Sequence, residues 1–340
     1  MAVYTPLTHA EISDFLADYE VGELVDFKGI AEGVSNTNYL IKTQKDEIFT
    51  QYILTIFEKN DDYKSLSYCL GLMEHLSSAG ITCPSPMADK NGNVIKSIKN
   101  KPAVIVSFLD RWHLNPKFEG FHNEWMSETL GDLCAKLHIY AHDYTDKREN
   151  PVSLEKWKEI KSRIGSKLNT IEPNLEKLVS DELKYIEENW IFDLPSGAIH
   201  ADLFPDNVAL VRDEVEGGHG GERALKGVID FYYACDDAWM YDVAICINAW
   251  CFNANTFELN EIFLKSFLNA YINERSNLGF SVSDAEKSAL PILTRVASMR
   301  FLVTRADAWL NRSEGALVNV KDPMEYVEKL RFWQNYEWQI

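Results

Sequence analysis

The chain has 340 residues, 46% of them hydrophobic and 12% aromatic, which is enough for two lobes or domains with cores of their own. Its formal net charge of −18 argues against a nucleic-acid-binding protein, which needs a basic surface for the phosphates. The same charge argues against binding to an anionic membrane surface. The composition indicates no particular oligomeric state.

The six cysteines form no C-x-x-C pair, so we expect buried, reduced thiols. No apolar run reaches the roughly 18 residues of a membrane-spanning helix. The chain does not open with a basic leader followed by an apolar run. Together these features predict a cytoplasmic protein.

The first predicted elements are a short helix and three strands. The pattern Thr8-His9-Ala10-Glu11 is that of a capping box that opens a helix. Strands are expected around 24–30, 39–41 and 49–57, where β-branched and aromatic residues are frequent.

The loop at 31–38 lies between the first two strands and is rich in small residues. We interpret it as a flap over phosphate groups, although an ordinary hairpin loop explains the same residues equally well. Its position ahead of the motif at 200–207 favours the phosphate interpretation. The candidate phosphate contacts are Gly33, Ser35, Asn36 and Thr37.

The rest of this lobe is predicted to contain a helix, a hairpin and a last strand. Apolar residues recur at helical spacing over 66–76, and Gly80 is placed to end that helix. Asn91-Gly92 predicts a hairpin, and the apolar run 103–109 predicts a strand that leads into a hinge. The candidate nucleotide contacts at the hinge are Ser107 and Leu109.

The second lobe is expected to be mainly helical. Helical periods dominate from about residue 121 onward, as in the stretch 292–303. We therefore predict an α+β protein, with a first lobe at 1–109 that carries a small sheet and a second lobe at 110–340. The glycine-rich segment Gly217–Gly221 is interpreted as an exposed hairpin tip.

One motif in the second lobe predicts phosphoryl transfer. His200-Ala201-Asp202 is followed by Asn207, and Asp230 comes 23 residues after Asn207. Phosphoryl transfer needs a carboxylate that orients the attacking hydroxyl and accepts its proton, and it needs oxygen ligands for divalent ions across the phosphates. In the kinase signature set these groups stand at this spacing. Asp202 is therefore the predicted catalytic residue, and Asn207 and Asp230 the predicted metal ligands.

The surroundings of the motif fit this interpretation. The apolar runs 198–199 and 225–229 are expected to be short buried strands that deliver the carboxylates to their ends. His200 is predicted to be a packed, hydrogen-bonded residue that shapes the loop. An acidic protein that binds ATP is expected to take the nucleotide with Mg²⁺, which neutralises the phosphates.

Longer strings of residues carry a resemblance to a known family. They are Gly29–Tyr39, Tyr52–Lys59, His200–Val208, Ile229–Cys235 and Tyr241–Phe252. In these strings the chain resembles the bacterial homoserine kinases of the aminoglycoside phosphotransferase and choline kinase-like family, which has the protein-kinase-like fold. The resemblance spans nearly the whole chain. It implies ATP-dependent phosphorylation of the side-chain hydroxyl of homoserine to O-phosphohomoserine, a step in threonine biosynthesis.

One position departs from the wider kinase pattern. Thr55 stands where many relatives carry a basic residue for the phosphates, although the homoserine kinases that the chain resembles share this threonine. Lys59, just past the strand, is an alternative source of that charge, but a solvated lysine is the commoner outcome there. Thr55 is kept as a candidate nucleotide contact.

A homoserine site needs a cation for the carboxylate and an anion for the ammonium. The candidates are Arg300, Arg305, Asp236 and Asp237. Each of them is also open to a structural role in an ion pair or on the surface. Asp242 is expected to be buried and to brace the catalytic loop by hydrogen bonds.

Three other functions remain open from the sequence. A choline or ethanolamine kinase would use the aromatic residues at 232–252 as a cage for a quaternary ammonium, although packing in a helical core explains them as well. A metal-dependent hydrolase would use Asp202, Asp206 and Asp230 with Asp236 and Asp237. A non-catalytic nucleotide sensor would explain the threonine at position 55.

Overall fold

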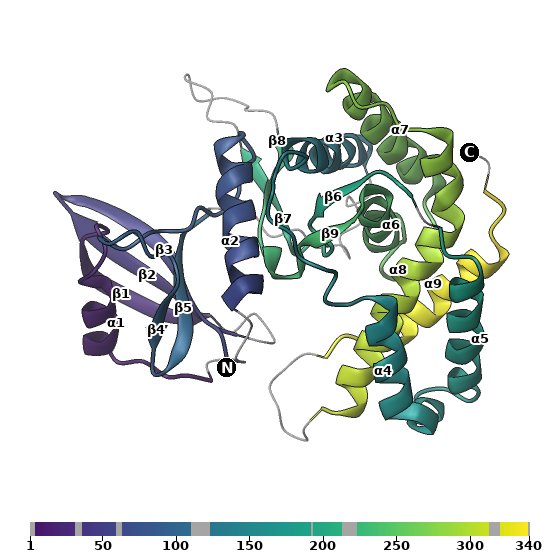
Figure 1. Cartoon of the computed structure of the whole chain (residues 1–340), viewed down its shortest axis with the longest axis horizontal. Coiled ribbons are helices and arrows are strands. Elements are labelled where there is room, and N and C mark those ends of the chain that lie inside the picture. The colour runs from purple at the N-terminus through teal and green to yellow at the C-terminus, as the bar shows by residue number, and fades with distance from the viewer. Residues whose placement is uncertain are drawn as a thin grey trace. The chain divides into compact units, whose positions relative to one another are not determined.

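The structure is a computed structural model that describes residues 4–30, 36–58, 63–109, 123–191, 193–212, 223–312 and 320–338. The described residues up to Leu109 form one compact unit, and those from Asn123 onward form a second (Figure 1). Each unit has its own hydrophobic core. None of the described helices is long and apolar enough to cross a membrane.

The first unit is built on an antiparallel sheet with strand order β1-β2-β3-β5-β4. Its elements are α1 (His9–Leu16), β1 (Glu23–Ile30), β2 (Thr37–Lys45), β3 (Ile48–Ile56), α2 (Tyr63–Ser78), β4 (Lys96–Ile98) and β5 (Lys101–Ser107). The predicted strands and the predicted helix at 66–76 are confirmed. The core of the unit joins the buried face of α1 to alternate residues of the sheet such as Tyr39, Ile41 and Leu54.

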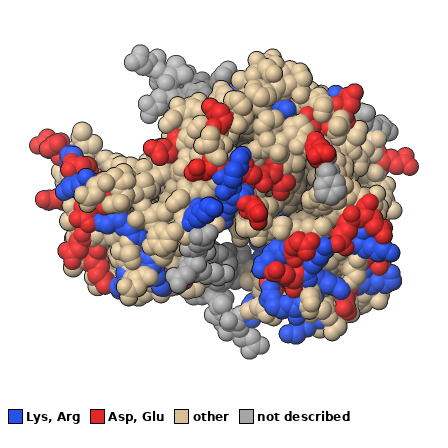
Figure 2. Space-filling model, in the orientation of Figure 1, with Lys and Arg blue, Asp and Glu red and all other residues tan. Residues whose placement is uncertain are grey.

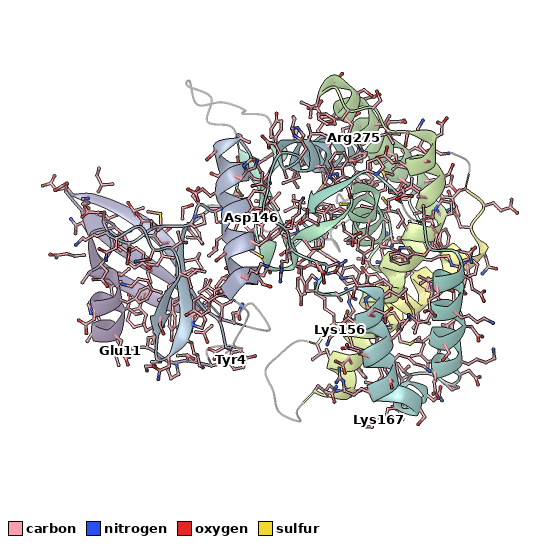
Figure 3. All side chains as sticks on the ribbon, in the orientation of Figure 1. Tyr4, Glu11, Asp146, Lys156, Lys167 and Arg275 are labelled. Carbon is pink, nitrogen blue, oxygen red and sulfur yellow. The ribbon has the colours of Figure 1, made fainter. Side chains whose placement is uncertain are left out.

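The capping box at the start of α1 is present as predicted. The Thr8 hydroxyl accepts a hydrogen bond from the Glu11 amide at 3.3 Å, and the Glu11 carboxylate (labelled in Figure 3) accepts one from the Thr8 amide at 2.7 Å. The two bonds satisfy donors that a helix start leaves open, so α1 begins at a defined residue.

The predicted hairpin at Asn91-Gly92 is wrong, because these residues form a turn that joins no paired strands. The turn is held by the Asp89 carboxylate, which accepts hydrogen bonds from the amides of Asn91 and Asn93. The hairpin lies instead at Lys99-Asn100 between β4 and β5, where both residues have positive φ, 50° and 63°. Such a turn matches the twist of paired strands, but Lys99 gives no sequence signal for it.

The second unit is mainly helical, with two small two-stranded sheets. Its helices are α3 (Glu124–Tyr140), α4 (Leu154–Ile164), η1 (Gly165–Thr170), α5 (Leu175–Glu188), η2 (Phe231–Tyr233), α6 (Trp239–Trp250), α7 (Glu261–Asn277), α8 (Asp284–Leu310) and α9 (Met324–Asn335). Its strands are β6 (Ser196–Ile199), β7 (Val208–Arg212), β8 (Arg223–Val228) and β9 (Cys235–Ala238).

Helix α8 is the centre of this unit, and it packs against α4, α5, α6 and α9. On another side α3 packs along α7. Gly131 permits this close approach, since a Cβ at that position would lie 2.5 Å from the carbonyl oxygen of Phe267.

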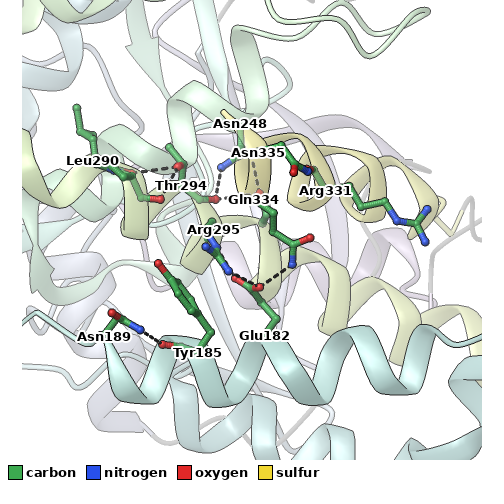
Figure 4. A network of polar contacts seen from close by, with 12 residues as sticks. Glu182, Tyr185, Asn189, Asn248, Leu290, Thr294, Arg295, Arg331, Gln334 and Asn335 are labelled. Atoms are coloured by element: carbon green, nitrogen blue, oxygen red, sulfur yellow. Dashed lines mark hydrogen bonds and ion pairs between the residues drawn. The ribbon is translucent and has the colours of Figure 1, made fainter. Parts of the chain in front are cut away.

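A polar network ties α5 to α8 and α9 (Figure 4). The Arg295 guanidinium donates two hydrogen bonds of 2.7 Å to the Glu182 carboxylate, and the Gln334 amide donates a third of 2.7 Å. Arg295 also lies 3.6 Å from the ring centroid of Tyr185. Glu182 is only 1% exposed, so its charge depends on these partners.

The surface charges of this unit are mixed in sign. Basic and acidic side chains alternate over the region of α4 and α5 in the space-filling view (Figure 2). Exposed pairs such as Lys177 with Asp181 belong to this surface. Pairs of this kind contribute little to stability because water and salt screen them.

We predict that replacing Arg295 with Met lowers the free energy of unfolding by about 3–5 kcal/mol, because the Glu182 carboxylate then stays buried without its ionic partner. Urea unfolding followed by tryptophan fluorescence measures the change. The matched control is Lys177→Met on the exposed face of α5, which is expected to change the value by less than ~0.5 kcal/mol. Equal effects of the two substitutions would contradict the role given to the pair.

Candidate active site

The predicted catalytic loop lies between two strands that the sheets hold in place. β6 pairs with β9 and ends at Ile199, and β7 starts at Val208 and pairs with β8. Residues 200–207 span the gap between β6 and β7. A hydrogen bond of 2.9 Å from the Ile229 amide to the Asn207 carbonyl brings the end of β8 beside the loop. Ile229 is thus bonded to the loop, and Asp230 is the next residue in the chain.

The buried carboxylate of Asp242 is hydrogen-bonded to the start of the loop. It accepts hydrogen bonds of 2.9 Å from the backbone amides of His200 and Ala201, and it is 0% exposed. The Asp242 carboxylate is therefore bonded to the first two residues of the loop. Ala201 has a positive φ of 61°, which costs a residue with a Cβ about 1–2 kcal/mol. The two bonds to Asp242 and one from the Arg300 guanidinium to the Ala201 carbonyl hold this conformation.

His200 connects the loop to the end of β8. Its Nδ1 accepts a hydrogen bond from the Asp202 amide at 3.2 Å, so the proton lies on Nε2, which donates to the Ile229 carbonyl at 3.0 Å. Burial lowers the pKa of His200 and keeps the ring neutral. Both ring nitrogens of His200 are therefore engaged in hydrogen bonds, one to the Asp202 amide and one to the Ile229 carbonyl.

Asp202 and Asn207 are in direct contact. The Asn207 Nδ2 donates to the Asp202 carboxylate at 3.0 Å and to the Asp202 carbonyl at 2.9 Å. Burial raises the pKa of the Asp202 carboxyl above its ordinary value of 3.8, and the positive charge of Arg300 limits the rise. A carboxylate that is fixed in direction and made more basic by burial suits a group that accepts a proton.

The side-chain oxygens of Asn207 and Asp230 suit a divalent cation that prefers oxygen ligands. Asn207 spends both Nδ2 hydrogens on Asp202, and its Oδ1 accepts no hydrogen bond from the described residues. Asp230 is exposed and adopts φ 65° and ψ 58°, at the N-cap of η2. An amide oxygen and a carboxylate, with phosphates and water to complete the shell, are ligands that Mg²⁺ prefers.

The nucleotide candidates of the first unit have different environments. The Thr37 hydroxyl accepts from the amides of Tyr4 and Thr5 and donates to Glu58, so it has no hydrogen-bonding capacity left for a phosphate. The Thr55 hydroxyl donates to the Asn38 side chain at 2.8 Å on the paired strand. A phosphate contact by the side chain of either threonine therefore requires a change of partner.

The remaining candidates of that unit are partly exposed or not described. Ser107 is paired with Ser85 through both backbone and hydroxyl, while Asn36 and Leu109 are partly exposed. Some predicted residues lie outside the described residues. They are Gly33, Ser35, Lys59 and the segment Gly217–Gly221.

Of the four substrate candidates, two have ionic partners. Arg305 donates to the Glu325 carboxylate at 2.6 Å, and Asp236 accepts from the Lys147 ammonium at 2.6 Å. Arg305 and Asp236 thus form structural ion pairs, the alternative role that the sequence left open for them. Arg300 lies beside the catalytic loop, and Asp237 accepts from the Asn150 amide at 2.7 Å.

Residues that the sequence did not single out support the loop. Burial works against a charge on His138, but Cys134 and Asp242 raise the pKa of its imidazole above the ordinary value, and its Nε2 lies 3.3 Å from the Asp242 carboxylate. The Trp250 indole donates to the Leu203 carbonyl at 2.7 Å. In the sequence, His138 could have been noticed as a histidine on the buried face of a predicted helix. Nothing in the sequence indicated the bond made by Trp250.

Known proteins resemble this chain over nearly its full length. A family model described as the phosphotransferase enzyme family matches residues 26–278. The homoserine kinase of Rhodopseudomonas palustris (strain ATCC BAA-98 / CGA009) is 43% identical over 98% of this chain and 95% of its own length. The homoserine kinase of Bradyrhizobium sp. (strain ORS 278) is 44% identical over 98% of this chain and 96% of its own length.

A solved structure is similar in fold. The amicoumacin kinase in complex with AMP-PNP, Ca²⁺ and Ami superposes with a TM-score of 0.68 at 16% identity, over 96% of this chain and 92% of that one. The fold is therefore the α+β, protein-kinase-like one, with a small antiparallel-sheet lobe and a larger, mainly helical lobe.

We predict that Asp242→Asn increases the rate of amide hydrogen exchange at one of residues 200 and 201 by at least about 10-fold. The asparagine NH₂ group faces one of the two amides as a second donor, so a bond worth about 1.4 kcal/mol or more is lost there. Exchange measured by mass spectrometry on a peptide that covers the loop tests this. Asp181→Asn on exposed α5 is the control, and unchanged protection of the loop in Asp242→Asn would contradict the bracing role.

Proposed function

This chain belongs to the phosphotransferase enzyme family, and we propose that it transfers the γ-phosphoryl group of ATP to the side-chain hydroxyl of L-homoserine. The product is O-phospho-L-homoserine, an intermediate of threonine biosynthesis. The observation that carries the proposal is the contact between Asp202 and Asn207 in a loop braced by Asp242. The identity of more than 40% to homoserine kinases over nearly the full chain supports the acceptor.

In the proposed reaction, the homoserine hydroxyl oxygen forms a bond to the γ-phosphorus while the bond from that phosphorus to the bridging oxygen of ADP breaks. Asp202 orients the hydroxyl and accepts its proton, which passes to solvent after the product leaves. The amide of Asn207 keeps the carboxylate turned in one direction. Positioned proton transfer of this kind contributes about 10²- to 10⁴-fold to the rate.

Asn207 and Asp230 would hold Mg²⁺ through the Asn207 Oδ1 and the Asp230 carboxylate. When bound, the ion neutralises the charge on the phosphates and on the leaving ADP. The nucleotide would be held by the first unit, through the loop after β1 and through groups at Asn36, Ser107 and Leu109. These assignments follow from the kinase spacing of the residues.

The other functions receive less support. Of the aromatic residues considered for a choline cage, Trp239, Trp250 and Phe252 are buried at 6% exposure or less and pack as core residues. A metal-dependent hydrolase needs a cluster of ligands, and the described residues contain no group of three or more His, Cys, Asp or Glu side chains placed to hold a metal ion. A non-catalytic nucleotide sensor, the third alternative, would bind ATP without turnover on any acceptor.

We place the reaction in the cytoplasm. All six cysteines are free and buried, as expected for thiols of a reducing compartment. The partners required by the reaction are ATP and the small-molecule acceptor.

The first test is a coupled assay of ADP release with homoserine, choline or an aminoglycoside as the acceptor. We expect turnover with homoserine alone, and we expect Asp202→Asn to lower kcat by at least about 10²-fold because the proton acceptor is lost. Nucleotide affinity, measured by fluorescence titration, should stay within a few-fold of the wild type. Preferred turnover of choline, or near-normal kcat in Asp202→Asn, would refute the proposal.

The pH dependence offers a second test. Asp202 acts as a base only when ionised, so kcat/KM falls as the pH drops through its pKa in the free protein, and burial places this fall above the pH expected from the ordinary value of 3.8. A pH profile of kcat/KM, with circular dichroism at each pH to exclude unfolding, measures the acidic limb. A limb at or below the ordinary value would contradict the environment described for Asp202.

A further inference from the structure

Arg300 differs from the other arginines of α8 in having no carboxylate partner. Arg295 is paired with Glu182, and Arg305 is paired with Glu325. Arg300 lies between them in sequence and is 2% exposed, yet no carboxylate of the described residues lies within ion-pair distance of it. The Asp202 carboxylate acts on Arg300 only from beyond ion-pair distance, so this buried guanidinium can still pair with a carboxylate supplied from outside the chain.

The contacts of Arg300 leave most of its donors unused. It donates to the carbonyl of Ala201, the residue before Asp202. Its guanidinium carbon lies 4.6 Å from the ring centroid of Phe301 and 5.5 Å from that of Tyr233. These rings accept no ordinary hydrogen bond, whereas a guanidinium has a planar fork of donors that matches a carboxylate.

A second buried donor lies next to Arg300. The Tyr241 hydroxyl is buried, lies close to the Arg300 guanidinium, and has no hydrogen bond of ordinary geometry with the described residues. Burial raises the pKa of the Tyr241 phenol, so it keeps its proton, and the neighbouring Arg300 opposes that rise. A tyrosine hydroxyl and a guanidinium side by side are suited to the two oxygens of one carboxylate.

Asp237 on β9 is an acidic side chain without an ionic partner among the described residues. Its neighbour Asp236 is paired with Lys147. Among the described residues, Asp237 accepts only from neutral groups, the Asn150 amide at 2.7 Å and the Ala238 backbone at 2.8 Å. Burial raises the pKa of Asp237, and Arg300 is near enough to oppose that rise without forming an ion pair with it. An unpaired cation and an unpaired carboxylate thus share one neighbourhood beside Asp202. Tyr233, whose ring centroid lies 5.5 Å from the Arg300 guanidinium carbon, is 42% exposed.

We infer that Arg300 with Tyr241 binds the carboxylate of the amino-acid acceptor and that Asp237 binds its ammonium group. The inference rests on the proposed function, because it names how that reaction selects its acceptor. A zwitterion placed between Arg300 and Asp237 gives each buried charge the partner that the chain itself does not supply. The hydroxyl at the other end of the same molecule then reaches Asp202.

Three acceptors test the carboxylate and the ammonium group of homoserine one at a time. L-Homoserine carries both, 3-amino-1-propanol lacks only the carboxylate, and 4-hydroxybutyrate lacks only the ammonium group. We expect the wild-type protein to show kcat/KM roughly 10- to 100-fold lower for each truncated acceptor, as charged hydrogen bonds are lost. ADP release measured under identical conditions gives the three values.

The substitution Arg300→Met is expected to remove the preference for homoserine over 3-amino-1-propanol, so that the ratio of their kcat/KM values approaches one. Asp237→Asn is expected to remove the preference over 4-hydroxybutyrate in the same way. Arg300→Lys keeps the charge without the planar fork and should give an intermediate ratio. It also provides the test if Arg300→Met does not fold, as judged by thermal melting.

Arg305→Met on the same helix is the matched control, since this arginine is already paired with Glu325. It should lower the melting temperature and keep the wild-type acceptor ratios. If Arg300→Met or Arg300→Lys lowers the kcat/KM of all acceptors by one common factor, Arg300 acts only through Ala201 and the inference is overturned, while the proposed function stands. If the wild-type protein phosphorylates none of the three acceptors, the proposed function fails and the inference with it.

Discussion

The carboxylate of Asp242 accepts hydrogen bonds from two successive backbone amides, those of His200 and Ala201, and the candidate site depends on this arrangement. Ala201 has a backbone conformation that is unfavourable for a residue with a side chain. The two bonds and the contact from Arg300 hold it there, and this turns the following residue, Asp202, toward Asn207. A buried charge is useful here because its partners are backbone groups that cannot move away.

The support of Asp242 extends well beyond the loop. His138 on α3 bonds to Asp242 on one side and to the Tyr271 hydroxyl on the other, at 2.9 Å. Tyr271 in turn accepts from Arg275 on α7 (Figure 3), whose charge is paired with Glu286 on α8 at 2.7 Å. Four helices, α3, α6, α7 and α8, therefore share one chain of buried polar groups that ends at the loop 200–207. Such a chain is rigid only when each member is satisfied.

The charged residues of the second unit serve two purposes that look alike in sequence. Arg295 and Arg305 are each paired with a carboxylate and join helices, while Arg300 on the same helix faces the catalytic loop without one. Asp236 and Asp237 are neighbours on β9, but the alternation of a strand points their side chains in opposite directions and gives them different partners. Pairing inside the fold therefore separates residues that stabilise the structure from those available to a ligand.

The sequence by itself determined strands β1, β2, β3 and β5, the helical character of the second unit, the capping box of α1 and the spacing of Asp202, Asn207 and Asp230, because these depend on local patterns of period and offset. It did not determine which charges meet. His138 and Asp242 are 104 residues apart, and the partners of Arg300, Arg305 and Thr37 come from distant segments. Only the tertiary structure decided these contacts, since each depends on how whole helices and strands pack rather than on neighbouring residues.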